Sequence, residues 1–119
     1  MPTAEAIVRR KDDSETVAAL PPESTVLEAA RLMNDRRVGS VLVLEGDRVA
    51  GIFTERDVLV RIVAAKRAPS STRLIDVMTS PVACAAPHTR TDELRKVMRE
   101  KRIRHIPVVD DGNVLGMIS

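Results

Sequence analysis

The sequence predicts an α+β fold, α/β-like in its alternation, made of two tandem copies of one β-α-β-β-α unit. When the 119-residue chain is shifted by 65 positions, residues 16–54 align with residues 81–119 without a gap. Nine of the 39 aligned pairs are identical, among them Gly51 with Gly116, and apolar positions coincide along the alignment. Self-similarity at a fixed offset indicates a repeated supersecondary unit.

The first copy opens with an extended segment, residues 16–19, followed by a helix. Thr25 and Glu28 stand three positions apart, which is the spacing of a capping box. Apolar residues over 26–33 then recur at helical spacing. The sequence therefore predicts a helix that begins just after Thr25.

Two strands and a second helix complete the first copy. The strands are predicted over residues 40–44 and 49–53, because the glycine and aspartate between them favour a hairpin. Residues 55–65 carry apolar side chains on one face and predict the second helix. Residues 66–72 contain a proline and two serines and are interpreted as a linker.

The second copy repeats this order but stops about eleven residues early. An extended segment over 81–85 leads to a helix capped by Thr89 or Thr91, followed by strands over 106–109 and 114–118. We therefore expect a trimmed form of a longer chain. The missing helix would leave apolar surface of the second copy bare unless a dimer partner covers it.

The repeats define two domains. A short helix over residues 4–11 precedes the first copy, since its apolar residues follow helical spacing. We place the first repeat, together with this helix, at residues 1–68. The second repeat, without its final helix, occupies residues 69–119.

Composition excludes several classes of protein. Nineteen Lys and Arg residues against 17 Asp and Glu give a net charge of +2, and the interleaved signs disfavour a nucleic-acid surface. Phe53 is the only aromatic residue, whereas proteins that bind single strands stack bases on several. No apolar run approaches the ~20 residues of a membrane helix. We expect a cytoplasmic protein that binds neither nucleic acid nor a membrane.

The sequence offers neither a metal site nor catalytic residues. Cys84 is the only cysteine, and with His88 and His105 it supplies too few ligands for a tetrahedral metal ion. Cys84 and His88 are separated by a proline, and no third residue is recognisable that would orient a nucleophile pair. We therefore predict that the protein is not an enzyme and that it holds no metal.

Both copies resemble the CBS domain, the family named after cystathionine β-synthase. The resemblance is carried by TVLEAARLMNDRRVGSVLVLEGDRVAGIFTERD in the first copy and by DELRKVMREKRIRHIPVVDDGNVLGMIS in the second. The intervening LIDVMTSPV is similar to the segment that leads into the family's second repeat. The most specific parts of the resemblance are the Gly-hydrophobic-x-Thr/Ser-x-x-Asp end of each unit and the hydrophobic-Pro-Val-Val-Asp strand of the second copy.

The resemblance implies a fold and a function. Two CBS units pack through their sheets as a pseudo-two-fold pair, and clefts between them bind adenosine-containing ligands in many members. We expect AMP, ADP, ATP or S-adenosylmethionine as a regulatory ligand, with no cofactor required. Pairs commonly form homodimers. Members act as sensors that regulate a partner protein rather than as catalysts.

The segment Thr54-Glu55-Arg56-Asp57 is the strongest candidate for ligand contacts. The Asp57 carboxylate can accept two hydrogen bonds from a ribose diol, Thr54 can bond a phosphate or ribose oxygen, and a helix N-terminus favours a nearby anion. The same Thr-x-x-Asp spacing also fits a capping box that only satisfies backbone N–H groups. The resemblance assigns the ribose to Asp57, and both interpretations stay open.

Basic residues before the second copy's first strand are the candidate phosphate contacts. Arg104 can make paired bonds to a phosphate, and His105 gains charge below about pH 6.5. By resemblance both touch ligand phosphates, and the alternative is a solvated turn. Gly39 and Ser40 hold these places in the first copy, where phosphate contacts would be weaker.

The remaining candidates are apolar or backbone contacts. Pro107 removes a backbone donor from its strand, which places the proline at an edge or a bulge. One interpretation is that free backbone groups here, beside Ile106, read an adenine edge. The alternative is that the proline only protects an edge strand. Val82 and Ala83 are adenine contacts by resemblance only. Ser119 matches the threonine of the first site, but its partner carboxylate would lie past the last residue.

Three functions follow from these features. The leading hypothesis is a regulatory module that senses an adenosine nucleotide in the cleft between the repeats. The alternative is a ligand-free module for dimerisation or partner docking, which would use apolar faces of the helices over 26–33 and 58–63. A third, nucleic-acid binding through the basic residues 95–104, would show a steep salt dependence.

Overall fold

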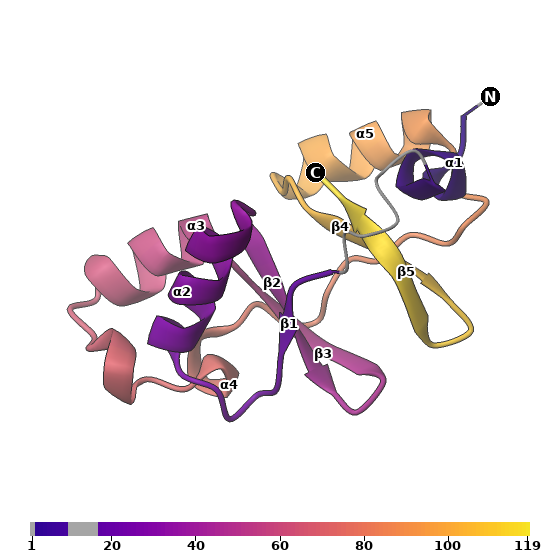
Figure 1. Cartoon of the computed structure of the whole chain (residues 1–119). Helices are drawn as coiled ribbons and strands as arrows, with labels where there is room; N and C mark the ends of the chain where they lie inside the picture. Colours follow the sequence, from indigo (N-terminus) through magenta and orange to yellow (C-terminus); the bar gives the residue numbers. More distant parts are fainter. Residues whose placement is uncertain (1, 10–16) are drawn as a thin grey trace. The chain divides into compact units, whose positions relative to one another are not determined.

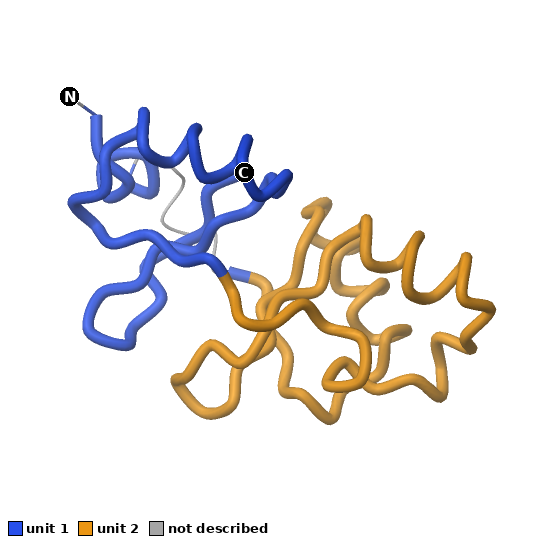
Figure 2. The backbone as a smooth tube through the Cα atoms, turned by 180° about the vertical axis from the view of Figure 1, so that it is seen from behind, with its two compact units in different colours: residues 1–17, 83–119 blue, residues 18–82 orange. Residues whose placement is uncertain are grey.

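The computed structural model describes residues 2–9 and 17–119, and Figure 1 shows its elements. The chain forms two compact units, which Figure 2 draws in different colours. Unit 2 is the continuous segment Ala18–Val82, whereas unit 1 combines Met1–Val17 with Ala83–Ser119. Each unit has its own cluster of buried hydrophobic residues.

Unit 2 is a three-stranded sheet packed against helices. Its elements, in chain order, are β1 (Ala19–Leu20), α2 (Val26–Arg36), β2 (Ser40–Glu45), β3 (Arg48–Thr54), α3 (Glu55–Asp57), the π-helix η1 (Val58–Val63), the 3-10 helix η2 (Pro69–Ser71) and α4 (Leu74–Val77). β1 runs parallel to β2, and β2 pairs antiparallel with β3, so that Val41 lies opposite Phe53. The predicted hairpin is confirmed. Of the first extended segment, Thr16 lies outside the described residues.

Thr25 caps α2, as its spacing from Glu28 predicts. The Thr25 hydroxyl oxygen accepts a hydrogen bond of 3.2 Å from the Glu28 backbone N–H. This bond satisfies one of the donors that a helix start leaves unpaired. The Glu28 carboxylate accepts from the Thr25 hydroxyl at 3.3 Å, so its contact is with the side chain. Only one half of the predicted box therefore forms here.

The predicted helix over residues 55–65 forms, but it is not a regular α-helix. α3 continues directly into η1, where hydrogen bonds span five residues, as from the Ala64 N–H to the Leu59 carbonyl at 2.9 Å. π-Helical turns are rare and occur frequently at functional sites. The sequence periodicity predicted the helix but not this hydrogen-bond pattern, and of its apolar residues Ile62 is buried whereas Leu59 and Val63 are exposed.

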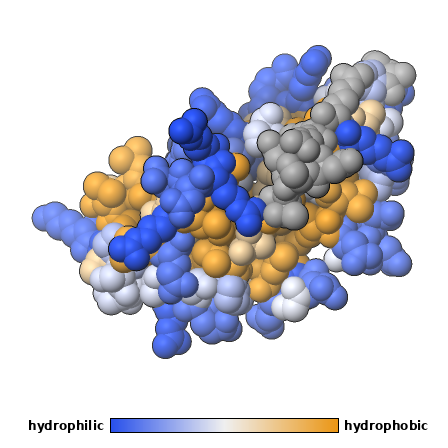
Figure 3. Space-filling view, in the orientation of Figure 1, coloured by the Kyte–Doolittle hydropathy of each residue, from blue (hydrophilic) through white to orange (hydrophobic). Residues whose placement is uncertain are grey.

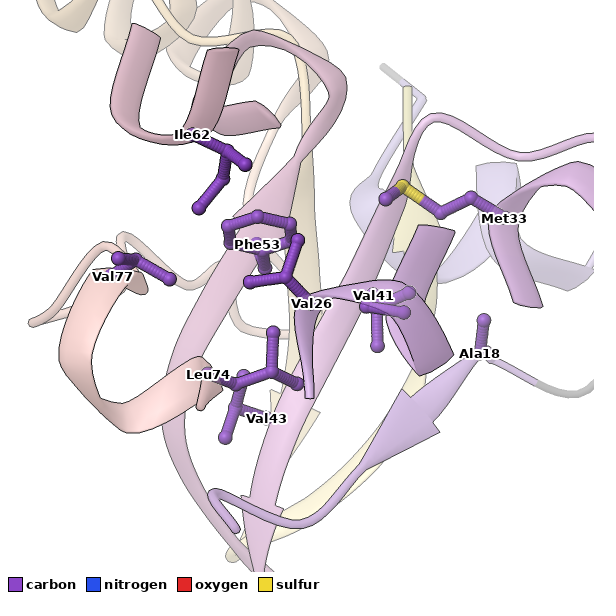
Figure 4. Close-up of a cluster of buried hydrophobic side chains, with 10 residues drawn as sticks. Ala18, Val26, Met33, Val41, Val43, Phe53, Ile62, Leu74 and Val77 are labelled. Carbon is purple, nitrogen blue, oxygen red and sulfur yellow. The ribbon is translucent and has the colours of Figure 1, made fainter. Parts of the chain in front are cut away.

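The core of unit 2 gathers around Phe53, which is fully buried. Figure 4 shows side chains from α2, β2, β3, η1 and α4 converging on one cluster. Val41 and Val43 are two apart on β2 and therefore point to the same face of the sheet. Leu74 and Val77 of α4 belong to the same cluster, so the segment after the predicted linker is part of this core.

Unit 1 is a β-hairpin packed against two helices. Its elements are α1 (Ala4–Arg9), α5 (Thr91–Lys101), β4 (Ile106–Asp110) and β5 (Asn113–Ile118). β4 and β5 are antiparallel, with Ile106 opposite Ile118. The predicted extended segment 81–85 contributes a single parallel bridge between Ala85 and Val108. Residues 10 and 11 of the predicted N-terminal helix lie outside the described part of the chain.

The predicted threonine caps of α5 are wrong. Arg90 is the N-cap residue and makes no side-chain capping bond. The Thr89 hydroxyl oxygen instead accepts from the Ala86 N–H at 3.0 Å, which closes the preceding turn. Thr91 is already the first helical residue, and its N–H donates to the Pro2 carbonyl at 3.2 Å. A contact distant in sequence thus replaces the expected local cap.

The compact units do not coincide with the predicted division at residue 68. α1 packs against β4 and β5 of the second repeat, and α4 packs against β3 of the first. Two glycines at equivalent repeat positions permit these contacts. A Cβ at Gly116 would lie 2.5 Å from Val8, and one at Gly51 would lie 2.5 Å from the Met78 sulfur. Each repeat is therefore covered by the segment that precedes the other repeat in sequence.

Candidate functional site

Thr54 and Asp57 form a complete capping box at the end of β3. The Thr54 hydroxyl oxygen accepts from the Asp57 N–H at 3.2 Å, and Asp57 Oδ2 accepts from the Thr54 N–H at 3.0 Å. The Thr54 hydroxyl also lies 3.1 Å from the same carboxylate oxygen. The structure thus confirms the capping interpretation of this pair. A capping role does not exclude a ligand role, because the carboxylate has a second oxygen.

That second oxygen contacts two further residues, Arg61 on the same helix and Thr79, which is distant in sequence. The Thr79 hydroxyl donates to Asp57 Oδ1 at 3.2 Å, and it lies 3.4 Å from Oδ2. Arg61 Nε lies 3.5 Å from Oδ1 and forms an ion pair with it. Only 12% of the Asp57 side-chain surface is exposed, against 44% for Arg61. The carboxylate is therefore nearly buried and carries hydrogen-bond donors on both oxygens.

Arg61 also holds the end of α4. Its Nη1 donates to the carbonyls of Val77 and Met78, each at 3.1 Å. Thr79 is placed by paired backbone bonds with Ile52 on β3, at 2.8 and 3.0 Å. One guanidinium thus connects the candidate carboxylate to the segment that leads out of unit 2.

Sequence reasoning missed Arg61 and Thr79. Arg61 stands four residues after Asp57, which is the spacing of an ion pair on one helical face, and this signal could have found it. Thr79 is 22 residues from Asp57, and no local pattern links them. Only the folding of the chain after α4 back onto β3 brings the two together.

The other predicted residues of unit 2 lie at or beyond the edges of this arrangement. Ser40 pairs with Thr54 across β2 and β3, and the Gly39 carbonyl accepts from the Glu55 N–H at 3.0 Å. Gly39 and Ser40 are thus adjacent to the capping box. Arg56 is exposed on α3, and Val82 is half-buried at the end of unit 2.

The remaining predicted residues all belong to unit 1. His105 Nδ1 and the Ser119 hydroxyl lie 3.2 Å apart, and Arg104 is exposed just before β4. Ile106 and Pro107 are buried in β4, and the Pro107 carbonyl accepts from the Ala85 N–H at 2.9 Å. The strand register shifts between Val108 and Val109, one residue after the proline, which agrees with the predicted bulge. Ala83, half-buried, begins the second segment of this unit.

The cysteine next to these residues is a poor nucleophile. Partial burial raises the pKa of the Cys84 thiol above its ordinary value of 9.0. Since the thiolate is the reactive form, a raised pKa lowers the reactive fraction at neutral pH.

Comparisons with known proteins place the chain among curated relatives of several sizes. YhcV of Bacillus subtilis, a CBS domain-containing protein, is 32% identical over 110 residues, 92% of this chain and 78% of the relative. The mitochondrial CBS domain-containing protein CBSX3 of Arabidopsis thaliana is 36% identical over 102 residues, 82% of this chain. The chain spans 50% of CBSX3 and 19% of CBSCBSPB3 from the same plant.

Solved structures share the whole fold. A proposed signal-transduction protein with CBS domains from Burkholderia ambifaria MC40-6 is 38% identical, with a TM-score of 0.94 over 99% of this chain and 88% of that one. CBS domain protein PAE2072 from Pyrobaculum aerophilum, complexed with AMP, is 25% identical, with a TM-score of 0.80 over 89% and 82%. A hexameric CBS-CP12 protein from cyanobacteria is 25% identical, with a TM-score of 0.86 over 100% and 67%.

Two further findings bear on the class of protein. None of the helices in the described residues is long and apolar enough to cross a membrane. The family model of the CBS domain matches residues 8–64 and 74–119, which together are most of the chain. The chain therefore belongs to the CBS domain family and carries two CBS domains in tandem.

Proposed function

We propose that this CBS pair is a regulatory module that binds an adenosine nucleotide, with AMP, ADP, ATP and S-adenosylmethionine as the candidates. The observation that carries the proposal is the nearly buried Asp57 carboxylate at the end of β3, where the family resemblance puts the ribose. The relative from Pyrobaculum aerophilum complexed with AMP supports this class of ligand.

Each proposed contact follows from the chemistry of its group. Asp57 accepts the ribose hydroxyls, and the Thr54 hydroxyl bonds a ribose or phosphate oxygen. In unit 1, Arg104 is an exposed cation that suits a phosphate, and His105 beside it adds charge when protonated. The other proposed contacts include polar, cationic and apolar groups; they are Gly39, Ser40, Arg56, Val82, Ala83, Ile106, Pro107 and Ser119.

The test is calorimetric titration of AMP, ADP, ATP and S-adenosylmethionine into the wild type and Asp57→Asn. Hydrogen bonds to a charged group contribute about 1.5–3 kcal/mol, so we expect affinity to fall about tenfold to a hundredfold in the variant. Asp76→Asn, which changes an exposed carboxylate of the same unit, is the matched control. Absence of binding at millimolar ligand, or equal affinity in Asp57→Asn, would refute the assignment.

A second candidate function is self-association, which a specific observation favours. Leu59, Val60 and Val63 on η1 expose 62%, 53% and 63% of their surface. Figure 3 shows hydrophobic surface gathered over this part of unit 2. The predicted apolar face of α2 is not available in the same way, because Val26 and Met33 lie in the core. We propose that the η1 face forms a homodimer interface, and the hexameric relative supports association in the family.

Light scattering on Val63→Glu tests this second function. A charge on the η1 face cannot be desolvated without a large cost, so we expect the variant to be monomeric at concentrations where the wild type is a dimer. Ala65→Glu introduces the same charge at another exposed position and should leave the dimer intact. A wild type that is monomeric throughout would exclude the interface.

A further inference from the structure

The Asp57 carboxylate is surrounded on both oxygens in this structure. A carboxylate offers about four lone-pair sites on its two oxygens. The Thr54 N–H and hydroxyl contact Oδ2, while the Thr79 hydroxyl and Arg61 Nε contact Oδ1. Three hydrogen-bond donors and the ion-paired Arg61 therefore surround these four acceptor sites. A ribose diol brings two more donors and must displace some of those present.

The four groups around the carboxylate are not equally firmly held. The Thr54 contacts are part of the capping box, and the Thr54 N–H is fixed by the backbone of β3. Arg61 makes the longest contact, 3.5 Å, and 44% of its side chain is exposed. Half-exposed ion pairs contribute little because water competes for both charges. Arg61 is thus the partner that leaves Oδ1 most readily.

We propose that Arg61 competes with the ligand's ribose hydroxyls for Asp57, so that ligand binding releases the arginine and with it the end of α4. This inference rests on the proposed function, since it assumes that Asp57 receives the ribose. The release follows because the same guanidinium holds the Val77 and Met78 carbonyls. Arg61 then acts as a positioning residue that reports occupancy of the site to residues 77–79, three residues before unit 2 ends.

Thr79 contacts the same carboxylate oxygen as Arg61 and is subject to the same competition. Its hydroxyl donates to Oδ1, so a diol that displaces Arg61 also competes with Thr79. The backbone of Thr79 remains tied to Ile52, and the Met78 N–H remains bonded to the Leu74 carbonyl at 2.7 Å. Loss of the side-chain contacts of Arg61 and Thr79 should therefore loosen residues 77–79 without unfolding them.

The experiment titrates adenosine, which has the ribose but no phosphate, into the wild type, Arg61→Met and Arg67→Met. Arg67 is an exposed arginine of the same unit, so its variant controls for the loss of one positive charge. We expect Arg61→Met to bind adenosine about two- to fivefold tighter, as the small contribution of a half-exposed ion pair implies. Arg67→Met should match the wild type.

Amide hydrogen exchange supplies the second readout. Adenosine should speed exchange at Met78 and Thr79 in the wild type while slowing it elsewhere in unit 2. In Arg61→Met these two amides should exchange fast already and not respond further to adenosine. Because the wild-type measurement needs no variant, the proposal stays testable even if Arg61→Met folds poorly.

The outcomes separate this inference from the function on which it rests. If the wild type binds neither adenosine nor AMP, the proposed function fails, and the competition fails with it. If the wild type binds adenosine and Asp57→Asn does not, the site stands. Weaker or unchanged binding by Arg61→Met, or unaltered exchange at residues 78 and 79, then overturns the inference alone.

Discussion

At the scale of single residues, the carboxylate of Asp57 combines structural and proposed ligand contacts. Its Oδ2 completes the capping box with Thr54, and its Oδ1 meets groups from the helix that follows and from the segment after α4. The sequence predicted the pair, because Thr-x-x-Asp spacing is local. It could not predict Thr79, which reaches Asp57 only after 22 residues of chain have folded back.

Thr54→Ala should destabilise the protein by about 1 kcal/mol, within the range of about 0.5–2 for a lost N-cap. The alanine removes the acceptor for the Asp57 N–H and the hydroxyl contact to Oδ2. Urea unfolding followed by circular dichroism measures the change. Thr54→Ser retains the hydroxyl and should stay near the wild type; a loss in Thr54→Ser as large as in Thr54→Ala would show that the methyl group matters instead.

At the scale of elements, sequence periodicity predicted most of the helices and strands, but it did not predict which of them pack together. The two hairpins, the helix after Thr25 and the helix over 91–101 all depend on local patterns of apolar and turn residues. The amphipathic pattern of a short helix such as α1 indicates only that one of its faces is buried. Which sheet it covers depends on shape, here on the space that Gly116 leaves for Val8.

Gly116→Ala tests that contact. The added Cβ would lie 2.5 Å from Val8, so we expect destabilisation of about 1–3 kcal/mol, the usual cost of overpacking. Val8→Ala removes the clashing methyl groups, so the double variant should be more stable than the sum of the two single changes predicts. If the double variant's change in unfolding free energy equals the sum of the two single changes to within about 0.5 kcal/mol, the packing of α1 on β5 is contradicted.

At the scale of the whole molecule, the chain folds as two units with separate hydrophobic clusters. One cluster is centred on Phe53 and the other on Ile106, Val108 and Ile118. The segment Ala18–Val82 is continuous, whereas the other unit joins both ends of the chain. Removing buried volume from one cluster should therefore act mainly on its own unit.

Phe53→Leu and Ile106→Val form a reciprocal pair for native-state hydrogen exchange. Loss of buried volume should cost about 1–2 kcal/mol for Phe53→Leu and about 0.5–1.5 for Ile106→Val. Protection should fall chiefly within Ala18–Val82 for the first variant and within Ala83–Ser119 for the second. An equal fall across the chain in both variants would mean that the units open as one.

The sequence by itself determined the repeat, the order of its elements and the family, because these depend on local periodicity, turn chemistry and motif spacing. Tertiary structure decided which element covers which sheet and which residues surround Asp57. Those contacts depend on side-chain shape and on chain reversals across many residues, as with Met78 over Gly51 and Thr79 beside Asp57. A local pattern carries no information about a partner that only folding brings near.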